Sequence, residues 1–348
     1  MGKRIAVMGT GAVGSYLGAF MSRAGYDITL IDPWGAHIDR IKGQGLHVSG
    51  FQGDFTVQVN ALHLAEAQQI TEPFGIIFLP VKSYDTEWAA HFAKRFLADN
   101  GVMVSSQNCM NDLLIAFIVG HEREVPCVVS GFAVALWEPG HVQRRSESEG
   151  PDHKVFRVGE LHGKITPRVE ELAEILSCVD GAYTTSNIWG ERWSKLTLNG
   201  VGNPVSAMTG LGSQGVAEDA RARRIEVHLA KESMQVGLAL SYNVDPYKGV
   251  EAQVWARADE GDTFEELEAS FHSEPGREDW QASMAQDIIK GRKTEIDQMN
   301  GYIVDRGRET GTATPVNAAV VQVVRDIQKG RLIPEPANLD RVLSMTGL

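Results

Sequence analysis

The sequence predicts an α/β domain with a parallel sheet, followed by a second domain built from helices. Short apolar runs alternate with helical segments in the first half of the chain, and a glycine-rich turn separates the first run from the first helix. From about Asn187 onward the strand-like runs disappear. Strands separated by helices are typical of βαβ units, so the first domain should hold a parallel sheet. We place the two domains at 1–186 and 187–348, since domains usually have about 100–200 residues.

The expected elements follow from apolar periodicity and length. Buried strands are expected at 4–9, 27–32, 74–82 and 102–108, and helices at 12–25, 83–101 and 167–179. The segments 126–144 and 153–161 are typical of a meander. In the second domain, helices are expected at 218–240, 264–272, 280–289, 293–309 and 315–330. Thr314 is expected to cap the last of these, with Pro315 at its first helical position.

The composition argues against several classes of partner. The formal net charge is −12, which disfavours binding to nucleic acid or an anionic membrane through bulk electrostatics. The three cysteines form no CxxC pair and the ten histidines form no ligand cluster, so no metal site is expected. No apolar run approaches the ~20 residues that span a bilayer. We therefore expect a cytoplasmic protein.

The glycine-rich turn reads GTGAVG and fits the G-x-G-x-x-G pattern of dinucleotide-binding folds. It follows a predicted strand and opens a predicted helix, which is the context that makes this pattern informative. Asp32 ends the second strand 18 residues after Gly14, near the position of a ribose-binding acid. An acid there would repel a 2′-phosphate, so a Rossmann-type site for NAD(H) rather than NADP(H) is predicted. The expected cofactor-binding residues are Gly9, Thr10, Gly11, Ala12, Val13, Gly14 and Asp32.

A polar stripe runs along the segment ERWSKLTLNGVGNP, which is otherwise typical of a buried helix. Lys195, Asn199 and Asn203 recur at i, i+4 and i+8, beside an apolar face that contains Trp193. Lysine is rarely buried without a partner. The stripe is therefore either a solvated face or one wall of a polar pocket.

These segments together resemble the ketopantoate reductases (2-dehydropantoate 2-reductases). The resemblance covers nearly the whole chain, in GTGAVG, VKSYDT, SQN, EPGHV, WSKLTLNGVGNPVSAMTG and SMAQDIIKGRKTEIDQMNGYIV. The last two are highly specific in combination. The resemblance implies a cytoplasmic NAD(P)H-dependent oxidoreductase of pantothenate biosynthesis. It also implies that the helical domain is similar to the C-terminal domain of 6-phosphogluconate dehydrogenase.

The resemblance also implies roles for the stripe. Lys195 would be the general acid that protonates the keto oxygen of a 2-oxo acid as hydride arrives from the nicotinamide. Asn199 and Asn203 would bind hydroxyl and carboxylate groups of this small-molecule substrate. Glu295 would hydrogen-bond the substrate and help to hold Lys195, and Ser283 would contact the substrate carboxylate. Taken without the resemblance, Ser283 could equally be a helix-surface serine.

Two further residues are expected near the nicotinamide, where such folds bind ligands. The resemblance places Asn108 near nicotinamide and substrate and gives Lys82 a cofactor contact, although Lys82 could also be a surface lysine at a strand end. The sequence departs from the family at Cys109, where glycine is usual, and Pro80 lies in the strand before Lys82. Family members that use NADPH carry a basic residue after the second strand, whereas this chain has IDPWGAHIDR.

Asp32 and the missing arginine leave the substrate and the direction of the reaction open. Dehydrogenation of a different 2-hydroxy acid is one alternative, and a non-catalytic NAD(H)-sensing protein is another. An opine or glycerol-3-phosphate dehydrogenase would share the domain plan but not both WSKLTLNGVGNP and TEIDQMNG. A homodimer through the helical domain is a further possibility.

Overall fold

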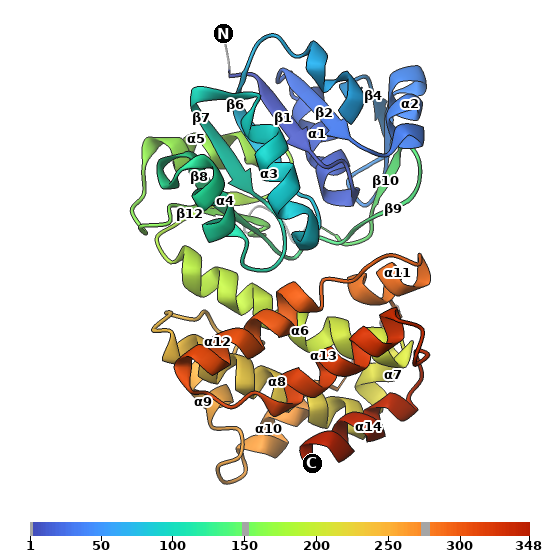
Figure 1. Ribbon diagram of the computed structural model, residues 1–348, viewed down its shortest axis with the longest axis vertical. Helices are drawn as coiled ribbons and strands as arrows, with labels where there is room; N and C mark the ends of the chain where they lie inside the picture. The colour runs from blue at the N-terminus through green and yellow to red at the C-terminus, as the bar shows by residue number, and fades with distance from the viewer. Residues whose placement is uncertain (1–2, 148–152, 273–278) are drawn as a thin grey trace. The chain divides into compact units, whose positions relative to one another are not determined.

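The computed structural model describes residues 3–147, 153–272 and 279–348 (Figure 1). The chain divides into two compact units, unit 1 at Met1–Ile188 and unit 2 at Trp189–Leu348. Unit 1 is an α/β domain and unit 2 is helical, which confirms the predicted fold class.

Unit 1 is organised around an eight-stranded sheet with the order β12-β11-β8-β7-β6-β1-β2-β5. Neighbouring strands are parallel except for β8 and β11, which are antiparallel. The strands are β1 Ile5–Met8, β2 Ile28–Asp32, β5 Asn60–His63, β6 Phe74–Leu79, β7 Leu97–Ser105, β8 Glu124–Val129, β11 Phe156–Gly159 and β12 Ala182–Thr185. The helices of unit 1 are α1 Ala12–Arg23, α2 Gly35–Gln44, α3 Thr86–Lys94, α4 Asp112–Val119 and α5 Pro167–Ser177. Short 3-10 turns occupy Leu64–Gln69 (η1), Ser83–Asp85 (η2) and His121–Arg123 (η3).

Helices cover both faces of this sheet because its strands are apolar on both sides. In β1, Ile5 and Val7 belong to a core that also contains Leu17 of α1. The alternate residues Ala6 and Met8 belong to a second core, formed with α3 and α4. Successive side chains of a strand point to opposite faces, so a continuous apolar run predicts a sheet buried on both sides.

Unit 1 also contains a second, four-stranded sheet, which shows that the predicted meander at 126–144 was wrong. Its order is β4-β3-β10-β9, and β10 pairs parallel with β3 and antiparallel with β9. The strands are β3 Leu46–Gly50, β4 Phe55–Val57, β9 Val134–Glu138 and β10 His141–Arg144. The expected meander at 126–144 is therefore divided, since β8 lies in the large sheet while β9 and β10 lie in the small one. The partner of β10 comes from a distant part of the sequence, which local pattern does not reveal.

Other predicted boundaries were also wrong. The helix expected at 83–101 ends at Lys94, and residues from Leu97 onward belong to β7. The strands at 46–63 were not expected; they are short, with partly exposed residues. Pro80 lies directly after β6 rather than within it, so it removes no donor from the sheet.

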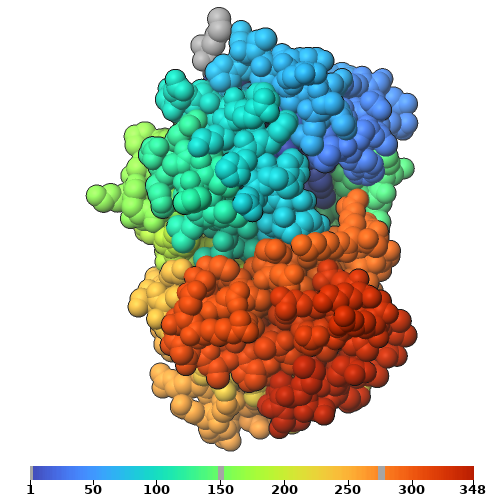
Figure 2. Space-filling model, viewed as in Figure 1, coloured from blue at the N-terminus to red at the C-terminus, as the bar shows by residue number. Residues whose placement is uncertain are grey.

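Unit 2 contains helices with one widened turn. The helices are α6 Ile188–Thr209, α7 Ser213–Glu218, α8 Ala220–Ala239, α9 Ala252–Ala256, α10 Thr263–Ala269, α11 Ser283–Ile289, α12 Tyr302–Thr310, α13 Pro315–Gln328 and α14 Ala337–Thr346, and η4 Asp297–Gly301 is a π-helical turn. Helices α7, α9 and α14 were not predicted. Orange and red segments make up most of the face of unit 2 seen in Figure 2. Helices α12, α13 and α14 each pack against α8. Among the described helices, none is long and apolar enough to cross a membrane.

The start of α13 differs from the prediction in its cap. Thr314 occupies the N-cap position and Pro315 follows it, but the threonine side chain makes no capping hydrogen bond. The carboxylate of Glu232 on α8 accepts hydrogen bonds from the N–H groups of Val316 at 2.8 Å and Asn317 at 2.9 Å instead. A carboxylate at a helix N-terminus is favoured by the helix dipole. The cap thus comes from another helix.

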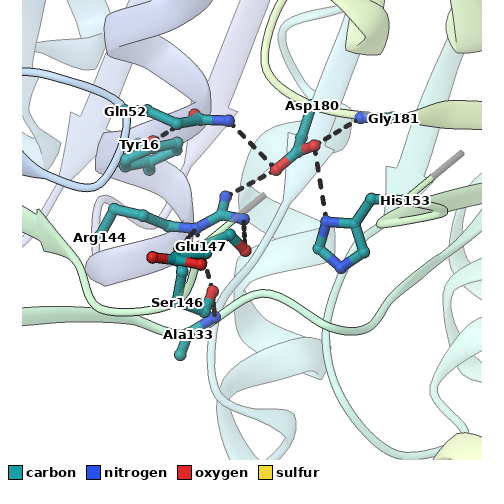
Figure 3. A network of polar contacts seen from close by, with 9 residues as sticks. All are labelled: Tyr16, Gln52, Ala133, Arg144, Ser146, Glu147, His153, Asp180 and Gly181. Carbon is teal, nitrogen blue, oxygen red and sulfur yellow. Dashed lines mark hydrogen bonds and ion pairs between the residues drawn. The ribbon is translucent and has the colours of Figure 1, made fainter. Parts of the chain in front are cut away.

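A buried ion pair ties the parts of unit 1 together (Figure 3). Arg144 of β10 lies 2.8 Å from the carboxylate of Asp180, which precedes β12, and their side chains are 0% and 3% exposed. Gln52 donates to the same carboxylate and accepts from the hydroxyl of Tyr16 on α1. Burial raises the pKa of Tyr16 to about 12, so this hydroxyl keeps its proton. The ion pair therefore joins the two sheets and α1.

We expect Asp180→Asn to lower the free energy of unfolding by about 3–5 kcal/mol, because it leaves the Arg144 charge buried without its counter-ion. Chemical denaturation measures this loss. The matched control is Asp305→Asn, which breaks an exposed ion pair with Arg308 and should change the stability little. Equal losses in the two variants would contradict the assigned importance of the buried pair.

Candidate functional site

The predicted cofactor residues of unit 1 lie at the carboxyl ends of four neighbouring strands. Gly9 follows β1, Asp32 ends β2, Lys82 follows β6 and Asn108 follows β7, and these strands are adjacent in the order β7-β6-β1-β2. From β1 the chain passes to β2, its neighbour on one side, whereas β6 lies on the other side of β1 and is followed by β7, so the strand order reverses between β1 and β6. Open α/β sheets bind ligands at such a switch point. We call this end of the sheet the cofactor edge.

The three glycines of the GTGAVG loop are needed for different physical reasons. Gly9 has φ of +100°, and a Cβ on it would lie 2.5 Å from a methyl group of Val81. A Cβ on Gly14 would lie 2.0 Å from the carbonyl oxygen of Gly9. A Cβ on Gly11 would meet no atom within 4 Å. The protein's own packing thus requires Gly9 and Gly14, whereas Gly11 leaves open space at the start of α1, where a phosphate could approach the N–H groups.

Asp32 is held against this loop by its own hydrogen bonds. One carboxylate oxygen accepts from the N–H of Thr10 at 2.5 Å, and the other accepts from the N–H of Trp34 at 2.8 Å. The residue is only 9% exposed. A carboxylate has about four acceptor positions, so two bonds leave capacity for ribose hydroxyl groups.

A chain of hydrogen bonds that the sequence did not reveal supports the loop from below. The N–H of Gly140 donates to Nδ1 of His37 at 2.9 Å, so Nδ1 carries no proton. Nε2 of the neutral ring therefore donates to the Ser15 hydroxyl at 3.0 Å, which in turn donates to the Thr10 carbonyl at 2.8 Å. Trp34 stacks on the His37 ring with an interplanar angle of 14°. These contacts give the EPGHV segment a structural task, since Gly140 belongs to it.

The turn after β7 holds the backbone of Asn108. Its carbonyl accepts hydrogen bonds from the Ser83 hydroxyl at 3.2 Å and the Asn111 amide at 2.8 Å. Cys109 has φ of +66°, a left-handed conformation that costs other residues more than glycine. This conformation favours glycine, and Cys109 adopts it while buried. Ser83 and Asn111 were missed as supporting residues because their partner is a backbone atom, which for Ser83 lies 25 residues away in the sequence.

In unit 2, the polar stripe lies on α6, which is helical throughout the stripe. Asn203 is buried, while Lys195 and Asn199 are half-buried, so the stripe is not a fully solvated face. The amide of Asn203 donates to the hydroxyl of Ser283, the first residue of α11, at 3.2 Å. Two predicted substrate-binding residues are therefore brought together from distant parts of the sequence. Glu295 is 4% exposed and lies just before the η4 turn.

We expect the stability of the protein to fall as the pH is lowered below about 6.5, in part through His37. Burial lowers the pKa of His37, while the nearby Asp32 charge acts in the opposite direction. The neutral ring's contribution is complete above the unfolded pKa and is lost as the pH falls through the folded pKa. Thermal unfolding between pH 7 and pH 5 should show a weaker pH dependence in His37→Asn. The exposed His91→Asn is the control, and it should keep the wild-type pH dependence.

Comparison with known proteins identifies a family for both halves of the chain. Residues 5–151 match the family model described as ketopantoate reductase PanE/ApbA. Residues 187–328 match the model of the C-terminal part of the same family.

Individual relatives agree with these matches. The 2-dehydropantoate 2-reductase of Archaeoglobus fulgidus is 29% identical over 329 residues, which cover 94% of this chain and 99% of the relative. That of Pyrococcus horikoshii is 26% identical and covers 92% of this chain and 96% of its own length. The crystal structure of a PanE/ApbA family ketopantoate reductase from Ralstonia eutropha has a TM-score of 0.77 at 26% identity, with 94% of this chain and 99% of that chain covered.

The same fold occurs in a dehydrogenase with a different name. D-mandelate dehydrogenase, solved with NADH and anilino(oxo)acetate, has a TM-score of 0.80 at 21% identity. The match covers 94% of this chain and 99% of that chain. This similarity concerns the fold alone. With both family models matched and full-length relatives that carry the reductase name, the chain belongs to the ketopantoate reductase family of oxidoreductases.

Proposed function

We propose that this protein reduces a 2-oxo acid, 2-dehydropantoate first of all, to the 2-hydroxy acid with a nicotinamide cofactor bound at the cofactor edge. The observation that carries the proposal is the stripe of α6, in which Asn203 contacts Ser283 in a chain matched to both family models. Four groups on one stripe and its neighbouring helix form a polar surface suited to a small acid with hydroxyl and carboxylate groups.

The proposed chemistry assigns one task to each group. The bound cofactor supplies the hydride for the keto carbon. As the carbonyl π electrons move to oxygen, the ammonium of Lys195 stabilises the developing alkoxide and donates the proton that completes the hydroxyl group. The neutral amine then regains a proton from solvent. Asn199, Asn203 and Ser283 would orient the substrate, and Glu295 would hold Lys195 and a substrate hydroxyl.

The residues of the cofactor edge suit a dinucleotide, and we propose NADH over NADPH. Gly11 leaves space for a diphosphate, while Lys82 and Asn108 would lie near the nicotinamide. The charge of Asp32 is fixed beside the glycine loop by two N–H groups. A 2′-phosphate needs a cationic partner, and the sequence from 33 to 39 contains no lysine or arginine.

A second candidate function is oxidation of a 2-hydroxy acid with NAD⁺, which the same Asp32 charge favours. The homodimer stays a prediction; a dimeric ketopantoate reductase from Staphylococcus aureus shares the fold at 18% identity and a TM-score of 0.70. Light scattering would determine the oligomeric state.

The first assay is oxidation of NADH and NADPH with 2-dehydropantoate and a panel of 2-oxo acids, followed by the reverse reaction. Cofactor binding without turnover of any acid in either direction would indicate a sensor and refute the enzyme.

We expect Lys195→Ala to lower kcat by about 10²- to 10⁴-fold, the usual contribution of a general acid. The dissociation constant for NADH should change little, because Lys195 acts on the substrate oxygen. Steady-state kinetics and a fluorescence titration with NADH separate the two. The exposed Lys329→Ala controls for the loss of a positive charge. Parallel losses of kcat and NADH affinity in Lys195→Ala would rule out the general-acid role.

We expect Asp32→Asn to raise the ratio of kcat/KM for NADPH to that for NADH by about tenfold, since charge-assisted hydrogen bonds contribute about 1.5–3 kcal/mol. The substitution keeps the size of the side chain and removes the charge that repels a 2′-phosphate. Asp39→Asn makes the same change at an exposed position of α2. An unchanged ratio in Asp32→Asn would show that this carboxylate does not meet the ribose.

A further inference from the structure

Helix α6 contains a proline in the middle of its functional segment. Pro204 lies inside the helix and, like every proline, has no backbone N–H. In an α-helix the N–H of residue 204 would donate to the carbonyl of Gly200. Pro204 therefore removes the regular donor for that carbonyl, which lies between Asn199 and Asn203 in the sequence. A buried carbonyl without a partner costs about 1–3 kcal/mol.

The side chain of Asn300 supplies a donor to this carbonyl. Its Nδ2 lies 2.7 Å from the Gly200 oxygen, and Asn300 is fully buried. Asn300 belongs to η4, where the N–H of Gly301 donates to the carbonyl of Ile296, five residues earlier, at 2.9 Å. Such π-helical turns often occur at functional sites. The N–H of Met299 donates to the carbonyl of Glu295 at 2.9 Å, so Glu295 is part of the same turn.

The direction of the Asn300 amide is set by a buried chain of partners. Its second Nδ2 hydrogen is donated to Oδ1 of Asn317 at 2.9 Å. The Asn317 amide donates in turn to Glu232 at 2.7 Å. Because Glu232 also accepts two backbone N–H groups of α13, it fixes Asn317 as a donor to it and as an acceptor for Asn300. The Asn300 nitrogen must then face both acceptors, which leaves no ambiguity between its oxygen and nitrogen.

We propose that Asn300 is a positioning residue for the reaction. Its amide replaces the donor that Pro204 removes from α6, and this bond docks the Glu295 turn onto the helix that carries Lys195 and Asn199. The inference rests on the proposed function, because it gives Glu295 and Lys195 their tasks. Pro204 and Asn300 therefore act together. Pro204 leaves the Gly200 carbonyl without its helical donor, and the hydrogen bond from Asn300 to this carbonyl fixes the Glu295 turn against α6.

The test combines Asn300→Ala with Pro204→Ala in a double-mutant cycle. Alanine at 204 returns an N–H to α6, so the Gly200 carbonyl no longer depends on Asn300. The loss of unfolding free energy caused by Asn300→Ala should therefore be smaller in the Pro204→Ala background. The loss of kcat should persist in both backgrounds at about tenfold to a hundredfold, since the helix donor does not reposition the Glu295 turn. The affinity for NADH should stay within about twofold of the wild-type value, because the proposed role of Asn300 involves no contact with the cofactor.

A matched control separates positioning from general support of α6. Asn338 of α14 is also buried, and its amide donates to the Met208 carbonyl, near the end of the same helix, at 2.8 Å. Asn338→Ala should lower the stability while kcat stays at the wild-type value. If Asn300→Ala does not fold, the comparison of Pro204→Ala with the double variant measures the same loss of kcat, because the carbonyl has its donor in both.

Three results would overturn the inference. Wild-type kcat in Asn300→Ala would show that the bond is only structural. Recovery of kcat in the double variant would show that an intact helix, rather than the Asn300 contact, sets the site. Identical stability losses in the two backgrounds would show that Asn300 and Pro204 are not coupled. Failure of the wild-type protein to turn over any acid would instead refute the proposed function, and with it the role of Asn300.

Discussion

Buried backbone N–H and C=O groups must find hydrogen-bond partners, and this constraint explains several contacts at loops, helix starts and the proline of α6. Where a helix starts, a strand ends or a proline interrupts the regular pattern, a side chain from another segment supplies the missing partner. Asp32 accepts the Thr10 N–H in the glycine loop, and Glu232 accepts the first N–H groups of α13. Asn300 donates to the Gly200 carbonyl that Pro204 leaves without its helical donor. Each of these bonds fixes a backbone segment that carries a proposed site residue or supports one.

The two units use this constraint for different purposes. In unit 1 the chain from Gly140 through His37 and Ser15 to Thr10 holds the glycine loop in one conformation, so a dinucleotide would meet N–H groups that are already oriented. Such preorganisation reduces the entropy lost on binding. In unit 2 the corresponding chain runs through Asn300, Asn317 and Glu232, and it orders the segment that contains Glu295. The proposed general acid therefore sits on a helix whose neighbours are held by directional bonds as well as by apolar packing.

Much of the fold follows from local pattern. The alternation of strands and helices, the glycine loop and Asp32 at the end of β2 predicted the parallel sheet and its cofactor edge, because a strand buried on both faces has a distinctive composition. The small sheet was missed because its strands are short and partly exposed, and because β10 pairs with β3 across a long stretch of sequence. The segment 97–101 was misassigned to a helix for a related reason: its pairing with β6 overrides a weak local preference.

The sequence by itself determined the class of the protein, since the glycine loop and the segments around Lys195 and Glu295 are specific enough to indicate the ketopantoate reductase family. It also determined which residues are candidates, because lysine and asparagine at helical spacing form one stripe whatever surrounds the helix. Only the tertiary structure decided what supports them. The Asn203–Ser283 contact, the ring orientation of His37 and the Asn300 bond to Gly200 join residues far apart in the chain. Their partners are often backbone atoms, which have the same chemistry at every position and so leave no mark in the sequence.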